Sequence, residues 1–222
     1  MADRVGLPEC SCVVVLRAED GAGRPLTEII REMAPLEKQD LLAEDGAGRA
    51  LMIKAGEDPD EIAEFVLAMM NTVDIESGIR LKAGISDVHR APEEWPAGYR
   101  EALEALEMGD KYHPKAQVQV YGHQFLERMM EQIPEETRVQ MRRHFFGEHP
   151  EQFLTEETLE TAEQFFEADL NLSVAARQMF VHRNTLTYRL DRIQKETGLN
   201  LRSFRDAAVF RMLMMMPEER NR

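Results

Sequence analysis

The sequence lacks the features that mark membrane and secreted proteins. No apolar stretch approaches the roughly 20 residues needed to cross a bilayer, and the apolar run 12–16 has only the length of a strand. The N-terminus has no basic region followed by a long apolar core, so nothing predicts secretion. The only two cysteines, Cys10 and Cys12, lie too close together on a predicted strand to form a useful disulfide. We therefore expect a cytoplasmic protein without a membrane partner.

Residue sets for catalysis and metal binding are also missing. No group of His and Cys has the spacing of zinc ligands, and no arrangement of Ser, His and Asp is suggested. The heptapeptide AEDGAGR occurs twice, at 18–24 and 43–49. Both copies are either plain surface turns or glycine-rich turns that cradle an anion, although neither has the residue order of a P-loop. We expect no catalytic residue, no metal and no cofactor, and hence a protein that is not an enzyme.

Basic residues are scarce, and they are unevenly distributed. The chain has 27 Lys and Arg against 41 Asp and Glu, a formal net charge of −14. Residues 1–170 hold 17 basic and 36 acidic residues, whereas residues 171–205 hold seven basic and two acidic residues, a net charge of +5. Phosphate binding depends on local Lys and Arg, so one basic segment on an acidic body is typical of a localised nucleic-acid footprint.

The first 122 residues alternate between strand and helix patterns. Strands are predicted where apolar residues alternate, and helices where apolar residues recur every three or four positions. The expected elements are strand 12–17, helix 26–33, a hairpin of strands 40–43 and 50–54, helix 58–73, strand 79–85, helix 94–108 and strand 118–121. This order predicts a sheet with helices packed against it.

From residue 123 the pattern is wholly helical. The expected helices are 125–132, 135–146, 156–170, 174–180, 184–196 and 204–216. We predict an α+β protein with an α/β sandwich domain at 1–122, a helical linker at 123–150 and an all-α domain at 151–222. The methionines near the C-terminus are expected in the core or at a dimer contact, namely Met212, Met214, Met215 and Met216.

The helices 174–180 and 184–196, joined by a short turn, have the layout of a helix-turn-helix. Ala176, Met179, Leu186, Leu190 and Ile193 are expected to form the buried face. The remaining faces carry side chains suited to base edges and phosphates, which are Arg183, Asn184, Thr185, Thr187, Tyr188, Arg189 and Arg192. Spacing alone is equally compatible with ordinary three-helix packing, and Arg192, Lys195 and Arg202 could form a plain solvated face.

The stretch VHRNTLTYRLDRIQKETG, within residues 153–215, resembles the C-terminal helix-turn-helix of the PucR/CdaR family of bacterial transcriptional regulators. The resemblance implies that this domain binds operator DNA. It also implies a DNA-facing end lined by His182, Arg183, Asn184, Thr185, Thr187, Tyr188 and Arg189. For His182 we favour a turn residue that bonds a nearby carbonyl over a base contact.

The N-terminal half is similar to the degenerate GGDEF-like domain that precedes this helix-turn-helix in many such regulators. The strand ending in Gly84 and Ile85 and the helix around Tyr99, Glu101 and Ala102 carry the similarity. In active diguanylate cyclases the hairpin turn bears GGDEF or GGEEF, whereas here 44–49 reads EDGAGR, so we expect no cyclase activity. We also expect a departure from the usual family layout, without a separate sensory domain before this module.

Together these features predict a homodimeric regulator that binds double-stranded DNA, with the helix near 183–196 reading the major groove. The acidic domain is expected to support assembly or to sense a signal, and a small-molecule effector remains unidentified. The alternative is a nucleotide-binding or protein-interaction module with a vestigial cyclase-like domain.

Overall fold

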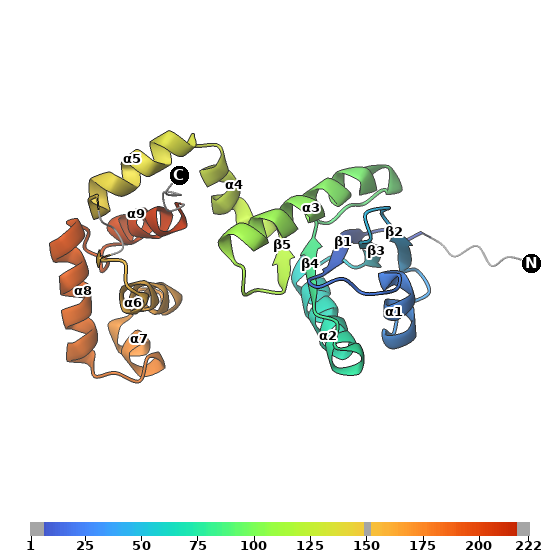
Figure 1. Ribbon diagram of the computed structural model, residues 1–222, viewed down its shortest axis with the longest axis horizontal. Coiled ribbons are helices and arrows are strands. Elements are labelled where there is room, and N and C mark those ends of the chain that lie inside the picture. Colours follow the sequence, from blue (N-terminus) through green and yellow to red (C-terminus); the bar gives the residue numbers. More distant parts are fainter. Residues whose placement is uncertain (1–6, 149–151, 217–222) are drawn as a thin grey trace, which may run out of the picture. The chain divides into compact units, whose positions relative to one another are not determined.

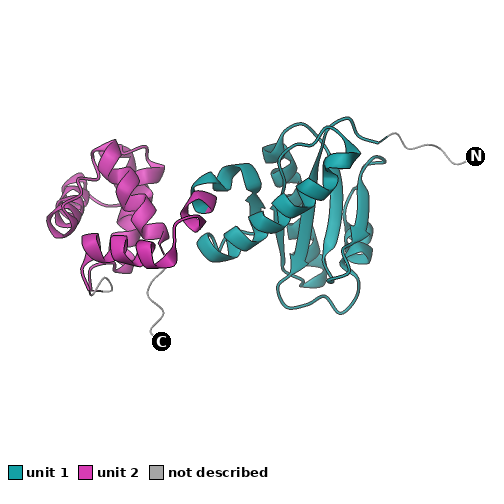
Figure 2. Cartoon of the chain, turned by 90° about the horizontal axis from the view of Figure 1, so that it is seen from above, with its two compact units in different colours: residues 1–127 teal, residues 128–222 magenta. Residues whose placement is uncertain are grey.

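The protein divides into two compact units, residues 1–127 and 128–222 (Figure 2). A computed structural model describes residues 7–148 and 152–216. None of the helices in these described ranges combines the length and the apolar character needed to span a membrane. The two units are described separately below.

The first unit is built on a five-stranded sheet with strand order β2-β3-β1-β4-β5. Its elements are β1 (Ser11–Ala18), α1 (Leu26–Met33), β2 (Leu41–Glu44), β3 (Ala50–Ala55), α2 (Pro59–Ser77), β4 (Leu81–Ile85), α3 (Trp95–Tyr112) and β5 (Val118–Val120), with short 3₁₀ turns at Pro92–Glu94 and Tyr121–Gln124. Strand β1 pairs antiparallel with both β3 and β4, and β5 pairs parallel with β4. The predicted order of strands and helices is confirmed.

Helices cover both faces of this sheet, α1 and α2 on one side and α3 on the other (Figure 1). Alternate residues of β1 serve the two faces, because successive side chains of a strand point in opposite directions. Cys12, Val14 and Leu16 pack with α1 and α2, whereas Val15 packs with Ala102 and Leu106 of α3. The cysteines Cys10 and Cys12 are free thiols, as expected. The first unit therefore has a hydrophobic core on each side of one sheet.

Two helices of this unit run further than the apolar pattern predicts. Helix α2 continues past the predicted end at 73 to Ser77, and it stops where Gly78 adopts a left-handed conformation with φ 69°. Helix α3 continues past 108 to Tyr112. The extra turns carry few apolar residues, so periodicity gives no sign of them.

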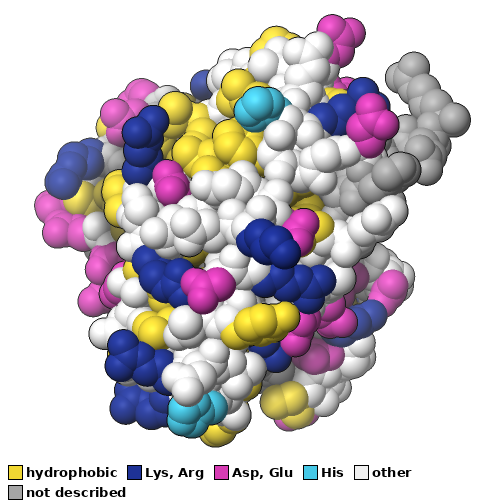
Figure 3. All heavy atoms as spheres, turned by 90° about the vertical axis from the view of Figure 1, so that its left-hand side faces the viewer, with side chains coloured by type: hydrophobic (Ala, Val, Ile, Leu, Met, Phe, Trp, Pro, Cys, Tyr) yellow, Lys and Arg dark blue, Asp and Glu magenta, His cyan; other side chains and the backbone are white. Residues whose placement is uncertain are grey.

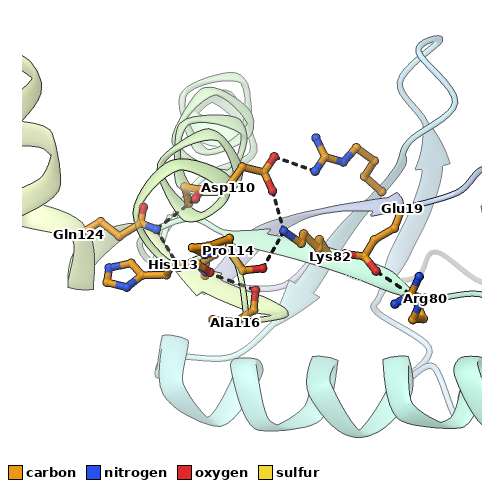
Figure 4. A network of polar contacts seen from close by, with 11 residues as sticks. Glu19, Arg80, Lys82, Asp110, His113, Pro114, Ala116 and Gln124 are labelled. Carbon is orange, nitrogen blue, oxygen red and sulfur yellow. Dashed lines mark hydrogen bonds and ion pairs between the residues drawn. The ribbon is translucent and has the colours of Figure 1, made fainter. Parts of the chain in front are cut away.

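A polar network ties the end of α3 to the sheet (Figure 4). Asp110 accepts hydrogen bonds from Arg17 Nη2 at 2.7 Å and from Lys82 Nζ at 2.9 Å, and Lys82 also donates to the carbonyl of Pro114 at 3.1 Å. Burial raises the pKa of Asp110, but the bonds from Lys82 and Arg17 outweigh this effect and hold that pKa below its ordinary value. The network thereby joins β1, β4 and α3 through one carboxylate.

The second unit is helical. Helix α4 (Phe125–Glu131) crosses the boundary between the units, and α5 (Glu135–Phe146), α6 (Glu156–Glu167), α7 (Leu172–Gln178), α8 (Arg183–Thr197) and α9 (Phe204–Met215) follow. Its core is centred on Phe165, Leu186, Leu190 and Phe210, each of them fully buried. An all-α second half, and with it the α+β class, is confirmed.

Both ends of the second unit take part in its core. Phe146 of α5 is buried against Phe210 in an edge-to-face contact with ring centroids 5.5 Å apart. Buried Arg142 donates to the carbonyl of Met216 at 2.6 Å, which ties α5 to the end of α9. The predicted core role of the C-terminal methionines is confirmed, because Met216 is buried and Met212, Met214 and Met215 pack against the same cluster.

Candidate nucleic-acid interface

Helix α7 begins with an asparagine cap. The side-chain Oδ1 of Asn171 accepts from the amides of Ser173 at 3.0 Å and Val174 at 3.2 Å, which satisfies two N–H groups that the helix leaves unpaired. The predicted helix 156–170 ends earlier, at Glu167, and the predicted start at 174 is also corrected, to Leu172. The physical reason is that Asp169 and Leu170 have φ values of 51° and 60°, a conformation that ends a right-handed helix.

The turn between α7 and α8 is a Schellman motif with Phe180 in its left-handed position. The amide of Val181 bonds the carbonyl of Ala176 at 3.0 Å, and the amide of Phe180 bonds that of Arg177 at 3.2 Å. Phe180 has φ 54°, so the helix predicted to reach residue 180 stops at Gln178. Its side chain is 95% exposed, and the sequence analysis did not single it out. The turn is therefore fixed by backbone bonds and not by packing of the ring.

Helix α8 begins immediately after His182. The Nδ1 atom of His182 accepts from the amide of Asn184 at 3.2 Å, and the side chain therefore caps the helix. A turn role was predicted, but with a bond to a carbonyl; the partner is an amide, because the free groups at a helix N-terminus are N–H donors. At the other end Gly198, with φ 75°, stops α8 after Thr197, one residue beyond the predicted end at 196.

One stripe of α8 is buried and fixes which faces remain open. Leu186, Leu190 and Ile193 are at most 2% exposed and pack in the same cluster as Phe165 of α6 and Ala175 of α7. The predicted buried face of the helix-turn-helix is thus confirmed for α8, and Ala176 is buried as well. Since these side chains follow one side of the helix, residues about half a turn away must face solvent.

The predicted site residues divide into two groups by exposure. Six are exposed, namely His182, Arg183, Asn184, Thr185, Tyr188 and Arg192. The other two, Thr187 and Arg189, are half-buried at the border of the apolar stripe. Arg189 Nη2 lies 2.8 Å from Glu157 Oε1 of α6, a partner that the sequence analysis missed. The structure therefore sets six predicted residues on the open surface of one capped helix and places Arg189 in an ion pair.

The charge of this surface is positive and locally unpaired. Within the described ranges, Arg183, Arg192 and Lys195 make no ion pair, whereas Arg202 pairs with Asp191 at 2.9 Å and donates to the carbonyl of Thr187 at 3.2 Å. Figure 3 views the side of the molecule on which α8 lies in Figure 1. Several Lys and Arg side chains lie near one another in the lower half of that view, with acidic side chains between them. Arg183, Arg192 and Lys195 can therefore attract phosphates without a carboxylate of the described residues competing for them.

The two AEDGAGR turns of the first unit line a common cavity of about 690 Å³. Arg24 forms a bidentate pair with Glu32, Arg17 bonds Asp110, and Arg49 pairs with Asp45. Burial raises the pKa of Asp45, yet bonds from the Ala47 amide, Arg49 and Tyr99 bring it below its ordinary value. Every arginine at this cavity already has a carboxylate partner, which favours surface turns over a phosphate site.

The second acidic turn residue is also engaged. Asp20 Oδ2 lies 3.1 Å from Arg80 Nη2, and Asp45 pairs with Arg49, so each of these two carboxylates already has a cationic partner. Across residues 7–148 and 152–216, no group of three or more His, Cys, Asp and Glu side chains is placed to hold a metal ion.

The sequence patterns of two known families match this chain, one in each unit. The sequence pattern of the PucR C-terminal helix-turn-helix domain matches residues 158–216, and that of the GGDEF-like domain matches residues 4–108. The carbohydrate diacid regulator of Escherichia coli (strain K12) is 37% identical over 60 residues, which are 27% of this chain and 16% of that protein. The purine catabolism regulatory protein of Bacillus subtilis (strain 168) is 22% identical over 171 residues, which are 75% of this chain and 32% of that protein.

The chain thus spans at most about a third of the length of these two regulators. Among solved structures, a regulator of polyketide synthase expression from Bifidobacterium adolescentis is 17% identical and matches 98% of this chain and 84% of that chain, with a TM-score of 0.38. That likeness is too distant to carry an argument. The family patterns, in contrast, cover the second unit from residue 158 in α6 to the end of α9, and the first unit from residue 4 to residue 108 in α3.

Proposed function

Because the chain belongs to the PucR/CdaR family of bacterial transcriptional regulators, we propose that it binds duplex DNA in a sequence-specific way and regulates transcription. In this proposal α8 is the recognition helix and enters the major groove with its N-terminal turns leading. The observation that carries the proposal is the open, unpaired surface of α8 formed by Arg183, Asn184, Tyr188 and Arg192. A cytoplasmic location follows from the proposed partner.

The side chains on this surface have separate expected roles. Arg183 and Asn184 stand at the start of the helix, where bidentate contacts to guanine and adenine are possible. Thr185, Thr187, Tyr188 and Arg192 are assigned to phosphates or groove walls, which position the helix but carry little sequence information. We expect His182 to act chiefly as the cap that orients the first turn of α8.

A single helix-turn-helix reads only one half-site, so we further propose that two copies of the chain bind one operator. The GGDEF-like unit is then available to hold the copies together or to sense an effector. An enzymatic role for that unit gains no support from Asp20 and Asp45 of its two glycine-rich turns, because both carboxylates are paired with arginines. The expected binding site is an inverted repeat whose halves lie about one helical turn apart.

The test starts from a library of random duplexes and the purified full-length chain. Rounds of selection should enrich an inverted repeat, and fluorescence anisotropy should give an affinity that falls steeply with salt. Arg183→Ala should weaken binding to the enriched duplex by about 1 to 3 kcal/mol. Arg100→Ala is the matched control, because it removes the same charge from an exposed position of α3 in the other unit.

Enrichment of no sequence, or an equal loss of affinity in both arginine variants, would contradict sequence-specific reading by α8. Thermal unfolding of each variant should match that of the wild type, because both arginine side chains are exposed. A large drop in melting temperature would instead assign the loss of binding to unfolding.

A further inference from the structure

Arg189 is the one predicted DNA-contacting arginine that already has protein partners. Its Nη2 atom lies 2.8 Å from Glu157 Oε1, and its Nη1 atom donates to Thr161 Oγ1 at 3.4 Å. Its side chain is 23% exposed, against 53% for that of Glu157. Both partners belong to α6, so the guanidinium bridges two helices of the second unit.

Thr161, one of the two acceptors of Arg189, is itself held in place. Thr161 is 1% exposed, and its hydroxyl donates to the carbonyl of Glu157 at 2.6 Å. The hydroxyl proton is thereby committed, and the oxygen remains an acceptor for Arg189. A buried, hydrogen-bonded threonine and a carboxylate one turn away therefore define a fixed fork for a planar guanidinium.

The bridge lies directly beside the proposed DNA-binding surface. A hollow of about 190 Å³ between α6 and α8 is lined by Glu157, Thr185, Tyr188 and Arg192 as well as by Arg189. Thr185 and Arg192 precede and follow Arg189 by about one helical turn, so the three side chains lie on the same side of α8. The bridge is thus placed to set the angle at which α8 meets a duplex.

We propose that Arg189 is a positioning residue of the helix-turn-helix: Glu157 and Thr161 hold it so that α8 keeps its tilt on α6, and it does not contact DNA itself. The inference rests on the proposed function of α8. Because the pair is partly exposed, it adds little to the stability of the fold. The main consequence of its loss is a misplaced recognition surface, and small misplacements weaken contacts that depend on geometry.

The direction in which Glu157→Gln changes the affinity for DNA separates this role from its alternatives. Glu157 places a negative charge beside the surface that would face phosphates, so Glu157→Gln should strengthen DNA binding if charge alone mattered. The same increase is expected if Glu157 merely competes with DNA for Arg189. If Arg189 positions α8, Glu157→Gln should instead weaken binding to the enriched duplex, by roughly twofold to 150-fold if the loss falls in the range of coupled neighbouring residues.

The experiment measures the affinity of the full chain for the enriched duplex and for a scrambled duplex. Glu160→Gln is the matched control, because Glu160 is exposed on the same helix and forms no ion pair within the described ranges. This control should bind as tightly as the wild type or slightly more tightly. Thr161→Val, which removes the fixed acceptor, should weaken binding in the same direction as Glu157→Gln.

A charge exchange gives a readout that a direct DNA contact does not share. In the double variant Glu157→Arg with Arg189→Glu, the reversed pair should restore much of the preference for the enriched over the scrambled duplex that Arg189→Glu alone loses. A side chain that touched phosphate or guanine could not be replaced by glutamate. The ratio of the two affinities is used because an added arginine raises binding to both duplexes.

Tighter or unchanged binding by Glu157→Gln, or an exchanged variant as unselective as Arg189→Glu alone, would overturn the positioning role. Melting curves should show the Glu157 and Arg189 variants folded, since they change only a partly exposed pair. The curve of Thr161→Val is the check on that variant, because Thr161 is buried. A wild-type chain that does not discriminate between the duplexes would refute the proposed function, and this inference with it. If the wild type discriminates between the duplexes but Glu157→Gln binds the enriched duplex more tightly, this inference alone is refuted.

Discussion

Replacing Phe180 with glycine should make the second unit more stable, although it removes a large aromatic side chain. Phe180 occupies the left-handed position of the turn between α7 and α8, with φ 54°, where a residue with a Cβ atom is strained by roughly 1 to 2 kcal/mol. Its ring is 95% exposed, so truncation gives up almost no buried apolar area. Glycine also gives the unfolded chain more conformational freedom, which offsets roughly 0.5 to 1 kcal/mol of the relieved strain. The expected net gain in the free energy of unfolding is about 0.5 to 1 kcal/mol.

Urea unfolding of the full chain can resolve this gain. Trp95 is the only tryptophan of the chain and lies in the first unit, so its fluorescence follows that unit and should not change. Circular dichroism at the helix band follows both units, and the part of its change that does not coincide with Trp95 fluorescence should shift to higher urea in Phe180→Gly. Phe180→Ala keeps the strained backbone and removes the ring, and it should leave the midpoint almost unchanged.

The result that refutes this reasoning is a loss of stability in Phe180→Gly. It would mean that the ring packs against the fold, or that the turn does not hold a left-handed residue. A drop of more than about 1 kcal/mol in Phe180→Ala would identify packing of the ring as the cause, because that variant keeps the Cβ atom.

Three further predictions concern the two cores and the titratable groups. Leu190→Ala should lower the free energy of unfolding by about 2 to 5 kcal/mol, because Leu190 is fully buried in the second unit; a loss below about 1 kcal/mol in urea unfolding would contradict the packing. Despite burial, bonds from Lys82 and Arg17 lower the pKa of Asp110. The contribution of this carboxylate to the free energy of unfolding is therefore complete above its ordinary pKa of 3.8 and is lost as the pH falls through the lowered pKa. Asp110→Asn should therefore unfold more readily at neutral pH and show a weaker acid dependence in Trp95 fluorescence; an unchanged acid dependence would argue against the network. Burial, reinforced by nearby carboxylates, raises the pKa of Cys12 to about 12, so iodoacetamide at neutral pH should modify this thiol only after denaturation. Mass spectrometry that finds Cys12 modified in the native protein would contradict this prediction.

Strong periodicity made most of the fold predictable from the sequence. The alternating run of β1 and the three-to-four spacing of Leu186, Leu190 and Ile193 depend only on which side chains must be buried. Gly78 and Gly198 end their helices in the left-handed conformation that glycine tolerates. The predicted end of α8 at 196 is one residue from the observed end, whereas the predicted end of α2 at 73 came four residues too early.

Local features without such a signal could not be predicted. Phe180 adopts a conformation that usually selects glycine, so its identity points away from the turn that it forms. Asn171 and Ser173 are both good cap residues, and only the backbone geometry decides that Asn171 serves.

The bridge of Arg189 to α6 belongs to a third kind of feature. Thr161 lies 28 residues before Arg189, and no periodicity within either helix relates the two positions. Glu157 lies in the helix predicted over 156–170, but no pattern within that helix indicates its partner. Contacts between helices depend on how they pack, which a local pattern does not encode.

The most direct test of the central claim asks which groove of the DNA receives α8. The enriched duplex can be methylated sparsely at guanine N7, in the major groove, or at adenine N3, in the minor groove, and then partitioned by binding to the full chain. We expect guanine N7 methylation within each half-site to exclude a duplex from the bound fraction, and Arg183→Ala to abolish that exclusion at one position. Binding that tolerates every N7 methyl group but is blocked by methylation at adenine N3 would contradict a recognition helix in the major groove.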